Sequence, residues 1–79
     1  MEKIKKGQLW KHYKNNENLY EIIGVGKNSE NLEQMVIYKA LYKGDFPIGQ
    51  IWVRPEKMFL EKIIKNGKKI KRFTLIKNI

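Results

Sequence analysis

The stretch IWVRPEKMFLEKIIKNGKKIKRFTLI, residues 51–76, contains the clearest fold signals in the chain. Asn66-Gly67 stands between two β-prone runs and favours a type I′ hairpin turn, in which both central residues have positive φ. Upstream, the residue before Pro55 is biased toward extended geometry, and proline suits the start of a helical turn. We therefore predict a strand, a short 3₁₀ or α turn over 55–60, and then a hairpin.

The two-residue turn also determines which side chains face each other across the hairpin. Ile63 opposes Ile70, and both are expected to point to the core, because side chains alternate between the two faces of a strand. Glu61 opposes Arg72 at the foot of the hairpin, where the two can form an ion pair. The opposite, solvated face is expected to carry Lys62, Lys69 and Lys71.

Further extended segments precede the hairpin, separated by residues that favour turns. They are expected at residues 8–14, 19–27, 35–42 and 50–54, with the polar segment 15–18 as a loop. This order predicts a mainly β fold, a small SH3-like barrel of five or six short strands with one short 3₁₀/α turn. An OB-type barrel ranks second, because it usually has longer strands and a longer helix.

Length and composition restrict the class of protein. Seventy-nine residues are enough for one small domain, 1–79, and the absence of cysteine excludes disulfides and thiolate zinc sites. The longest apolar run, Met35 to Tyr38, is far short of the roughly 20 residues that span a membrane. With no apolar segment behind the basic start and His12 as its single histidine, the chain is expected to be cytoplasmic, without membrane, metal or cofactor.

The net charge of +9 is concentrated at the two ends of the chain. Residues 1–16 carry +4, residues 17–61 carry −2 and residues 62–79 carry +7. Because the termini of small domains often lie close together, these segments could form one basic face that attracts polyanions. The plainer interpretation is a solvated lysine-rich surface. The residues expected to contact nucleic acid are Lys5, Lys6, Lys62, Lys69, Lys71 and Arg72.

Aromatic residues form a second pattern. In the strand over 50–54, Ile51 and Val53 point one way while Trp52 and Arg54 point the other. If the aliphatic faces form the core, a partly exposed patch suited to base stacking or cation–π contacts is expected. The alternative is that these rings simply cover a small barrel. The patch would contain Tyr20, Tyr38, Trp52 and Arg54.

Catalysis has one candidate arrangement. Ser29, Glu30 and His12 would form a nucleophile triad if the first strand passed the loop that holds Ser29. The alternative interpretation is that Ser29 and Glu30 shape a turn through bonds from side chain to backbone. The turn-making interpretation is the one that the sequence favours.

Two segments, VIYKALY at 36–42 and WVRPEKMFLE at 52–61, are the most specific parts of a family resemblance that runs from about residue 6 to residue 76. Through them the chain resembles the DUF1653 family of small bacterial proteins of unknown function. The family's loop often reads H-S-E-T, whereas this chain has asparagine before Ser29, which weakens the triad. The resemblance supplies no catalytic residue. It directs attention to Tyr13 and Lys14, to Pro55, Met58 and Phe59 as structural positions, and to a ligand-binding set. That set consists of Tyr20, Ser29, Glu30, Tyr38, Trp52 and Arg54.

The leading hypothesis is a small β-barrel binding module that engages nucleic acid or another anionic partner, such as an acidic protein. Fifteen lysines against two arginines favour phosphate contact over bidentate reading of bases. A peptide- or protein-binding adaptor that uses an aromatic groove is the alternative. A small hydrolase ranks third, and oligomeric state cannot be inferred from the sequence.

Overall fold

The computed structural model describes residues 3–79, apart from the side chains of residues 15 and 16. This range is mainly β, as expected, with seven strands and one short helix. The last expected strand is divided at Arg72, which raises the strand number above six. The elements are β1 (Leu9–His12), β2 (Asn15–Lys27), β3 (Gln34–Ala40), β4 (Ile51–Pro55), α1 (Glu56–Phe59), β5 (Lys62–Lys65), β6 (Lys68–Lys71) and β7 (Phe73–Lys77).

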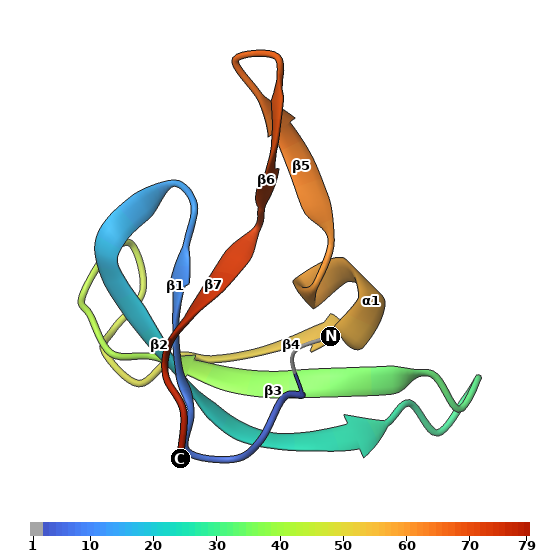
Figure 1. Cartoon of the computed structure of the whole chain (residues 1–79). Helices are drawn as coiled ribbons and strands as arrows, with labels where there is room; N and C mark the ends of the chain where they lie inside the picture. The colour runs from blue at the N-terminus through green and yellow to red at the C-terminus, as the bar shows by residue number, and fades with distance from the viewer. Residues whose placement is uncertain (1–2) are drawn as a thin grey trace.

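Five strands form one antiparallel sheet in the order β4-β3-β2-β1-β7, and β5 and β6 form a separate sheet (Figure 1). The described residues therefore form no closed barrel, and the coarse part of the prediction, a mainly β fold, is confirmed. At Arg72 the chain leaves the hairpin, before β7 pairs with β1. The hairpin consequently projects away from the five-stranded sheet (Figure 1).

The hairpin itself is confirmed. Asn66 and Gly67 have φ values of 53° and 77°, the positive values that a type I′ turn requires. The register pairs Ile63 with Ile70, as predicted, although both side chains are only half-buried. At the foot, the Arg72 guanidinium and the Glu61 carboxylate lie 2.8 Å apart.

The predicted loop over residues 15–18 is wrong. The turn lies at Tyr13-Lys14, His12 pairs with Asn15, and β2 begins at Asn15. The Lys14 backbone N–H donates to His12 Nδ1 at 3.2 Å, which closes this turn. The polar residues of this segment predicted a loop because asparagine is uncommon in strands. That preference is weak at the end of a strand pair, where the backbone can remain paired.

The predicted inward face of β4 is also wrong. Val53 is 58% exposed and Ile51 is exposed too, whereas Trp52 packs against the core. The rings occupy the interior because they bury more surface than aliphatic side chains do. The buried core consists of Ile4, Trp10, Ile22, Val36, Tyr38, Phe59 and Phe73.

The segment that precedes β1 lies beside the C-terminal end of the chain. Gln8 is buried, and its Nε2 donates to Asn78 Oδ1 at 2.9 Å. In Figure 1 the blue segment before β1 passes the C mark at the bottom of the molecule, while the hairpin tip is at the top. Lys5 and Lys6, which precede Gln8, and the hairpin lysines therefore do not form one continuous basic face.

No helix in residues 3–79 is long and apolar enough to cross a membrane.

Candidate functional site

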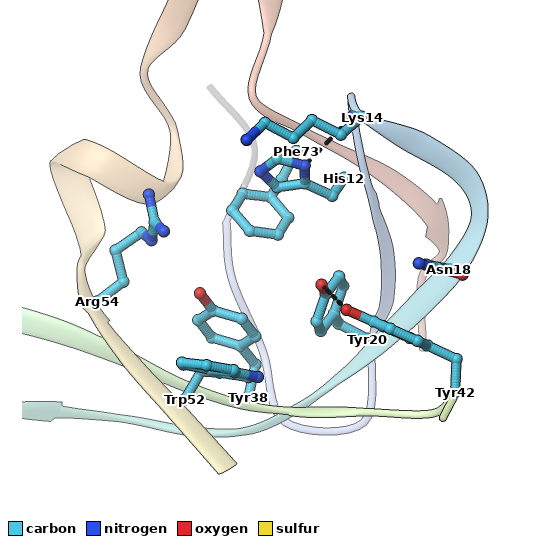
Figure 2. Close-up of a pocket in the computed structure, with 9 residues that line it drawn as sticks. All are labelled: His12, Lys14, Asn18, Tyr20, Tyr38, Tyr42, Trp52, Arg54 and Phe73. Atoms are coloured by element: carbon cyan, nitrogen blue, oxygen red, sulfur yellow. Dashed lines mark hydrogen bonds between the residues drawn. The ribbon is translucent and has the colours of Figure 1, made fainter. Parts of the chain in front are cut away.

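The concave side of the five-stranded sheet contains a pocket of about 320 Å³, hereafter the aromatic pocket (Figure 2). Its walls come from β1, the β1–β2 turn, β2, β3, the segment after β3, β4 and β7. Residues from segments far apart in the sequence thus meet at one place. The lining residues are His12, Lys14, Asn18, Tyr20, Tyr38, Tyr42, Trp52, Arg54 and Phe73.

Strand register explains why Tyr38, Trp52 and Arg54 share a face. Tyr38 is the direct partner of Trp52, and Val36 is the partner of Arg54. Side chains directly opposite each other in an antiparallel pair lie on the same face, and positions two apart do as well. Trp52 and Arg54 therefore both point into the pocket, which leaves Val53 on the outer face.

The floor of the pocket is made of packed rings. Tyr38 and Phe73 are 4% and 3% exposed, and their ring centroids lie 5.5 Å apart in an edge-to-face arrangement. Phe73 stacks on Phe59 at 4.1 Å, and Tyr20 meets Tyr38 edge-on at 5.4 Å. Such contacts add to the stabilisation from burial, and they make the floor continuous with the core.

Three tyrosines and one arginine line the pocket, with Arg54 on the opposite side from the Tyr20–Tyr42 pair (Figure 2). The Tyr20 and Tyr42 hydroxyls are 2.6 Å apart, and burial together with this hydrogen bond raises the pKa of Tyr20. Burial also raises the pKa of Tyr38, against the opposing hydrogen bond and charge of Arg54. The Arg54 guanidinium carbon lies 5.8 Å from the Phe73 ring centroid, a cation–π distance. The hydroxyls of Tyr20 and Tyr38 therefore stay protonated and can donate to an anion.

The pKa of His12 is sensitive to the positive charges around the pocket. Burial, followed by the charges of Arg54, Lys14 and Arg72, lowers the pKa of His12 from 6.5 to about 4. The ring is neutral at pH 7, and because Nδ1 accepts from the Lys14 backbone, its proton is on Nε2. The imidazole is therefore a donor in a positively charged pocket, an environment that favours anions and disfavours cations.

The structure brings together four of the six residues expected to bind a ligand. Tyr20, Tyr38, Trp52 and Arg54 all line the aromatic pocket. The four residues meet for a different reason from the one predicted. The aliphatic face of β4 is outside and its aromatic face is inside, the reverse of the expected arrangement.

Ser29 and Glu30 lie elsewhere, in the connection between β2 and β3. The Glu30 backbone N–H donates to Asn28 Oδ1 at 2.9 Å, and the Leu32 N–H donates to the Asn28 carbonyl at 2.7 Å. The segment is thus a turn, and its side-chain bond to the backbone comes from Asn28, not from Ser29 or Glu30. Because neither Ser29 nor Glu30 lines the pocket that contains His12, the geometry gives no support to a Ser–His–Glu triad.

Several lining residues were not identified from the sequence as ligand-binding. The strand pattern puts Lys14 at a strand end and Asn18 in a loop, and His12 is a candidate only as a catalytic base. Alternation along the strand expected at 35–42 puts Tyr42 on the same face as Tyr38, which is the one available signal. Phe73 could not be found, because its place beside β1 depends on the break at Arg72.

The cations expected to contact nucleic acid are in different environments. Arg72 forms an ion pair with Glu61, and Lys5 and Lys6 belong to the segment before β1. Lys62 and Lys69 are exposed on the hairpin, where they share a face with Lys71. Within residues 3–79, no three His, Cys, Asp or Glu side chains gather as they would around a metal ion.

A family model described as a protein of unknown function, DUF1653, matches residues 8–75 of the 79-residue chain. This range includes every residue that lines the aromatic pocket. No curated protein and no solved structure matches the chain significantly.

Proposed function

The chain belongs to the DUF1653 family, whose function is unknown, and we propose that it is a small binding module for single-stranded nucleic acid. In this proposal the aromatic pocket accepts a phosphate together with part of the adjoining nucleotide. Exposed lysines of the hairpin add less specific contacts to neighbouring phosphates.

The convergence of cations, hydroxyl donors and rings in one pocket carries the proposal. Arg54 and Lys14 supply positive charge, and the neutral His12 supplies an N–H donor. Trp52 and Tyr20 offer ring surface beside these groups. A phosphate needs the first set, and a base or sugar packs against the second. A cationic ligand, which aromatic cages often hold, would be repelled by the same charges.

The polypeptide topology supports the finer fold assignment that we propose, an SH3-like barrel in a partly open form. Four consecutive strands are adjacent in the sheet, and the final strand returns to pair with the first. The short helix α1 precedes that return, after β4. In this arrangement the hairpin of β5 and β6 is an insertion between the helix and the last strand.

The proposal is tested by fluorescence anisotropy with labelled mixed-sequence RNA and DNA strands at low salt. Wild-type protein is expected to bind single strands, with an affinity that falls as salt is added. Arg54→Ala should weaken binding about tenfold, while Lys27→Ala, which removes the same charge at the exposed end of β2, should change it little. Absence of binding at about 100 μM protein, the weak end of non-specific affinities, would refute the proposal.

An acidic peptide is the second candidate, favoured by one observation. The strand β4, which carries Trp52 and Arg54, is at the edge of the sheet, and an edge strand can pair with an added peptide strand. Reversing the charges of Lys62 and Lys69 separates the two ligands. Nucleic-acid binding should weaken, whereas a peptide held by β4 and the aromatic pocket should be largely unaffected.

A further inference from the structure

A second hollow of about 340 Å³ adjoins the aromatic pocket and is called the acceptor pocket below. The two share three residues, Asn18, Tyr42 and Trp52. In Figure 2, Asn18 and Tyr42 lie toward one side of the aromatic pocket, away from Arg54 and the amino end of Lys14. The acceptor pocket is lined by Asn18, Ala40, Tyr42, Gly44, Asp45, Phe46, Gln50 and Trp52.

The loop between β3 and β4 forms most of this second hollow, and backbone bonds hold it in place. The Gly49 N–H donates to the Ala40 carbonyl at 2.8 Å, and Gly49 has a φ of 90°, which favours glycine. A β-carbon at Gly44 would lie 3.1 Å from Tyr42 Cε2, so the backbone packs closely against that ring. The acceptor pocket is therefore preorganised.

The acceptor pocket presents hydrogen-bond acceptors, whereas the aromatic pocket presents cations and hydrogen-bond donors. Asp45 contributes a carboxylate, and Gln50 donates Nε2 to the Ile51 carbonyl at 3.2 Å, which leaves its Oε1 as the acceptor. Phe46 is 52% exposed and meets Trp52 edge-on at 5.1 Å. The hollow thus combines hydrogen-bond acceptors with an apolar ring wall that a planar group could cover.

A ligand that fills both hollows must have three parts. It needs an anion beside Arg54 and Lys14, a planar group across Trp52 and hydrogen-bond donors facing Asp45. A nucleotide whose base has an exocyclic amino group has all three in this order. Cytosine presents its N4 amino group as a donor to a carboxylate, whereas uracil presents an O4 acceptor at the same position.

We infer that the acceptor pocket holds the amino-bearing edge of a base, so that the protein prefers cytidine to uridine in a single strand. This inference rests on the proposed function. It assigns Asp45 as a specificity-determining residue and the aromatic pocket as the site of the adjoining phosphate.

Competition between hexamers of cytidine and of uridine for a labelled mixed-sequence strand tests the inference. The two hexamers carry equal phosphate charge and differ at the base edge. The wild-type protein should bind the cytidine hexamer about tenfold more tightly, within the range for a good contact to a base edge. Asp45→Asn should reduce this ratio to near one. Glu30→Gln removes the same charge from an exposed loop outside both pockets and should preserve the ratio.

Each failure has a distinct meaning. Equal binding of both hexamers by the wild-type protein would overturn the inference and leave the proposed function standing. A preference for cytidine that survives Asp45→Asn would also overturn it, because the discrimination would then lie elsewhere. If neither hexamer binds at low salt, the proposed function fails together with the inference.

Discussion

The aromatic pocket and the hairpin of β5 and β6 both present positive charge, yet they hold it in different ways. In the pocket, Arg54 lies over the ring of Phe73, which is 3% exposed. On the hairpin, Lys62 and Lys69 are exposed beside Ile64, which is 68% exposed and belongs to a sheet of only two strands. One region is built on the core, and the other projects from it.

The comparison shows that the largest excess of positive charge does not coincide with the aromatic pocket. The segment with the largest excess, residues 62–79, contributes only Phe73 to the lining of the aromatic pocket. Its exposed lysines lie in solvent, where salt screens their charge. Arg54 comes from the middle of the chain, which is slightly acidic overall. Packing, and not the number of lysines, places a cation where it can make a directed contact.

The largest expected difference between the two regions is in stability. Phe73→Ala removes a buried ring that stacks on Phe59 and should lower the free energy of unfolding by about 3–5 kcal/mol. Ile64→Ala on the hairpin should change it by about 0.5 kcal/mol or less, because most of that side chain is already in water. Urea denaturation of both variants measures the difference. Comparable losses would show that the hairpin is part of the core.

The second difference concerns binding and its salt dependence. Arg54→Ala should weaken binding of single-stranded RNA about tenfold, an effect that includes a directed contact. Lys69→Ala should weaken it less and mainly reduce the slope of log affinity against log salt, by about 0.7 for one phosphate contact. Anisotropy titrations at several salt concentrations measure both quantities. If Lys69→Ala has the larger effect, the hairpin is the main binding surface.

The third prediction concerns pH and involves the pocket alone. The unfolded chain protonates His12 near pH 6.5, while the folded chain resists until about pH 4, the lowered pKa. Stability should therefore be complete above pH 6.5 and fall as the pH drops toward 4, by about 1 kcal/mol for a half-exposed ring.

Unfolding by urea at pH 7.5 and at pH 5 checks the direction. His12→Asn, which keeps a hydrogen-bond acceptor for the Lys14 N–H, should lose less stability between these two values. An equal loss in both proteins would mean that the pKa of His12 is not depressed in the folded state. Binding of an anion should raise that pKa again.

The smallest expected effect is at the foot of the hairpin. Glu61→Gln weakens the pair with Arg72, which is partly exposed, and should lower the free energy of unfolding by about 1 kcal/mol or less. Binding through the aromatic pocket should be unchanged. Thermal denaturation detects the first effect and anisotropy the second. A large loss of affinity would show that the orientation of the hairpin controls the pocket.

Local signals in the sequence were sufficient for the hairpin and the helical turn. Asn66-Gly67 needs positive φ at two adjacent residues, a requirement that few other turns share, and the register follows from the turn length alone. Pro55 precedes α1, as the bias of proline toward the start of a helical turn predicts. Such features depend on neighbours in the chain and can be read from it.

Features that depend on long-range packing were harder to predict. Alternation along β4 correctly grouped Trp52 with Arg54, but it could not decide which face is inside. That choice rests on rings supplied by α1 and β7, such as Phe59 and Phe73. The turn expected at residues 15–18 lies at 13–14, so the strand pattern did not place Lys14 in the pocket. The composition of the pocket could therefore be predicted only in part.

The two tryptophans allow one direct test of the proposal that the aromatic pocket binds nucleic acid. Trp52 lines the pocket, whereas Trp10 is buried, with its indole N–H donating to Gln8 Oε1 at 3.1 Å. In ¹H–¹⁵N NMR spectra, titration with the cytidine hexamer at low salt should shift the indole signal of Trp52 and leave that of Trp10 in place. Shifts confined to the backbone amides of the hairpin, with the Trp52 indole unmoved, would contradict it.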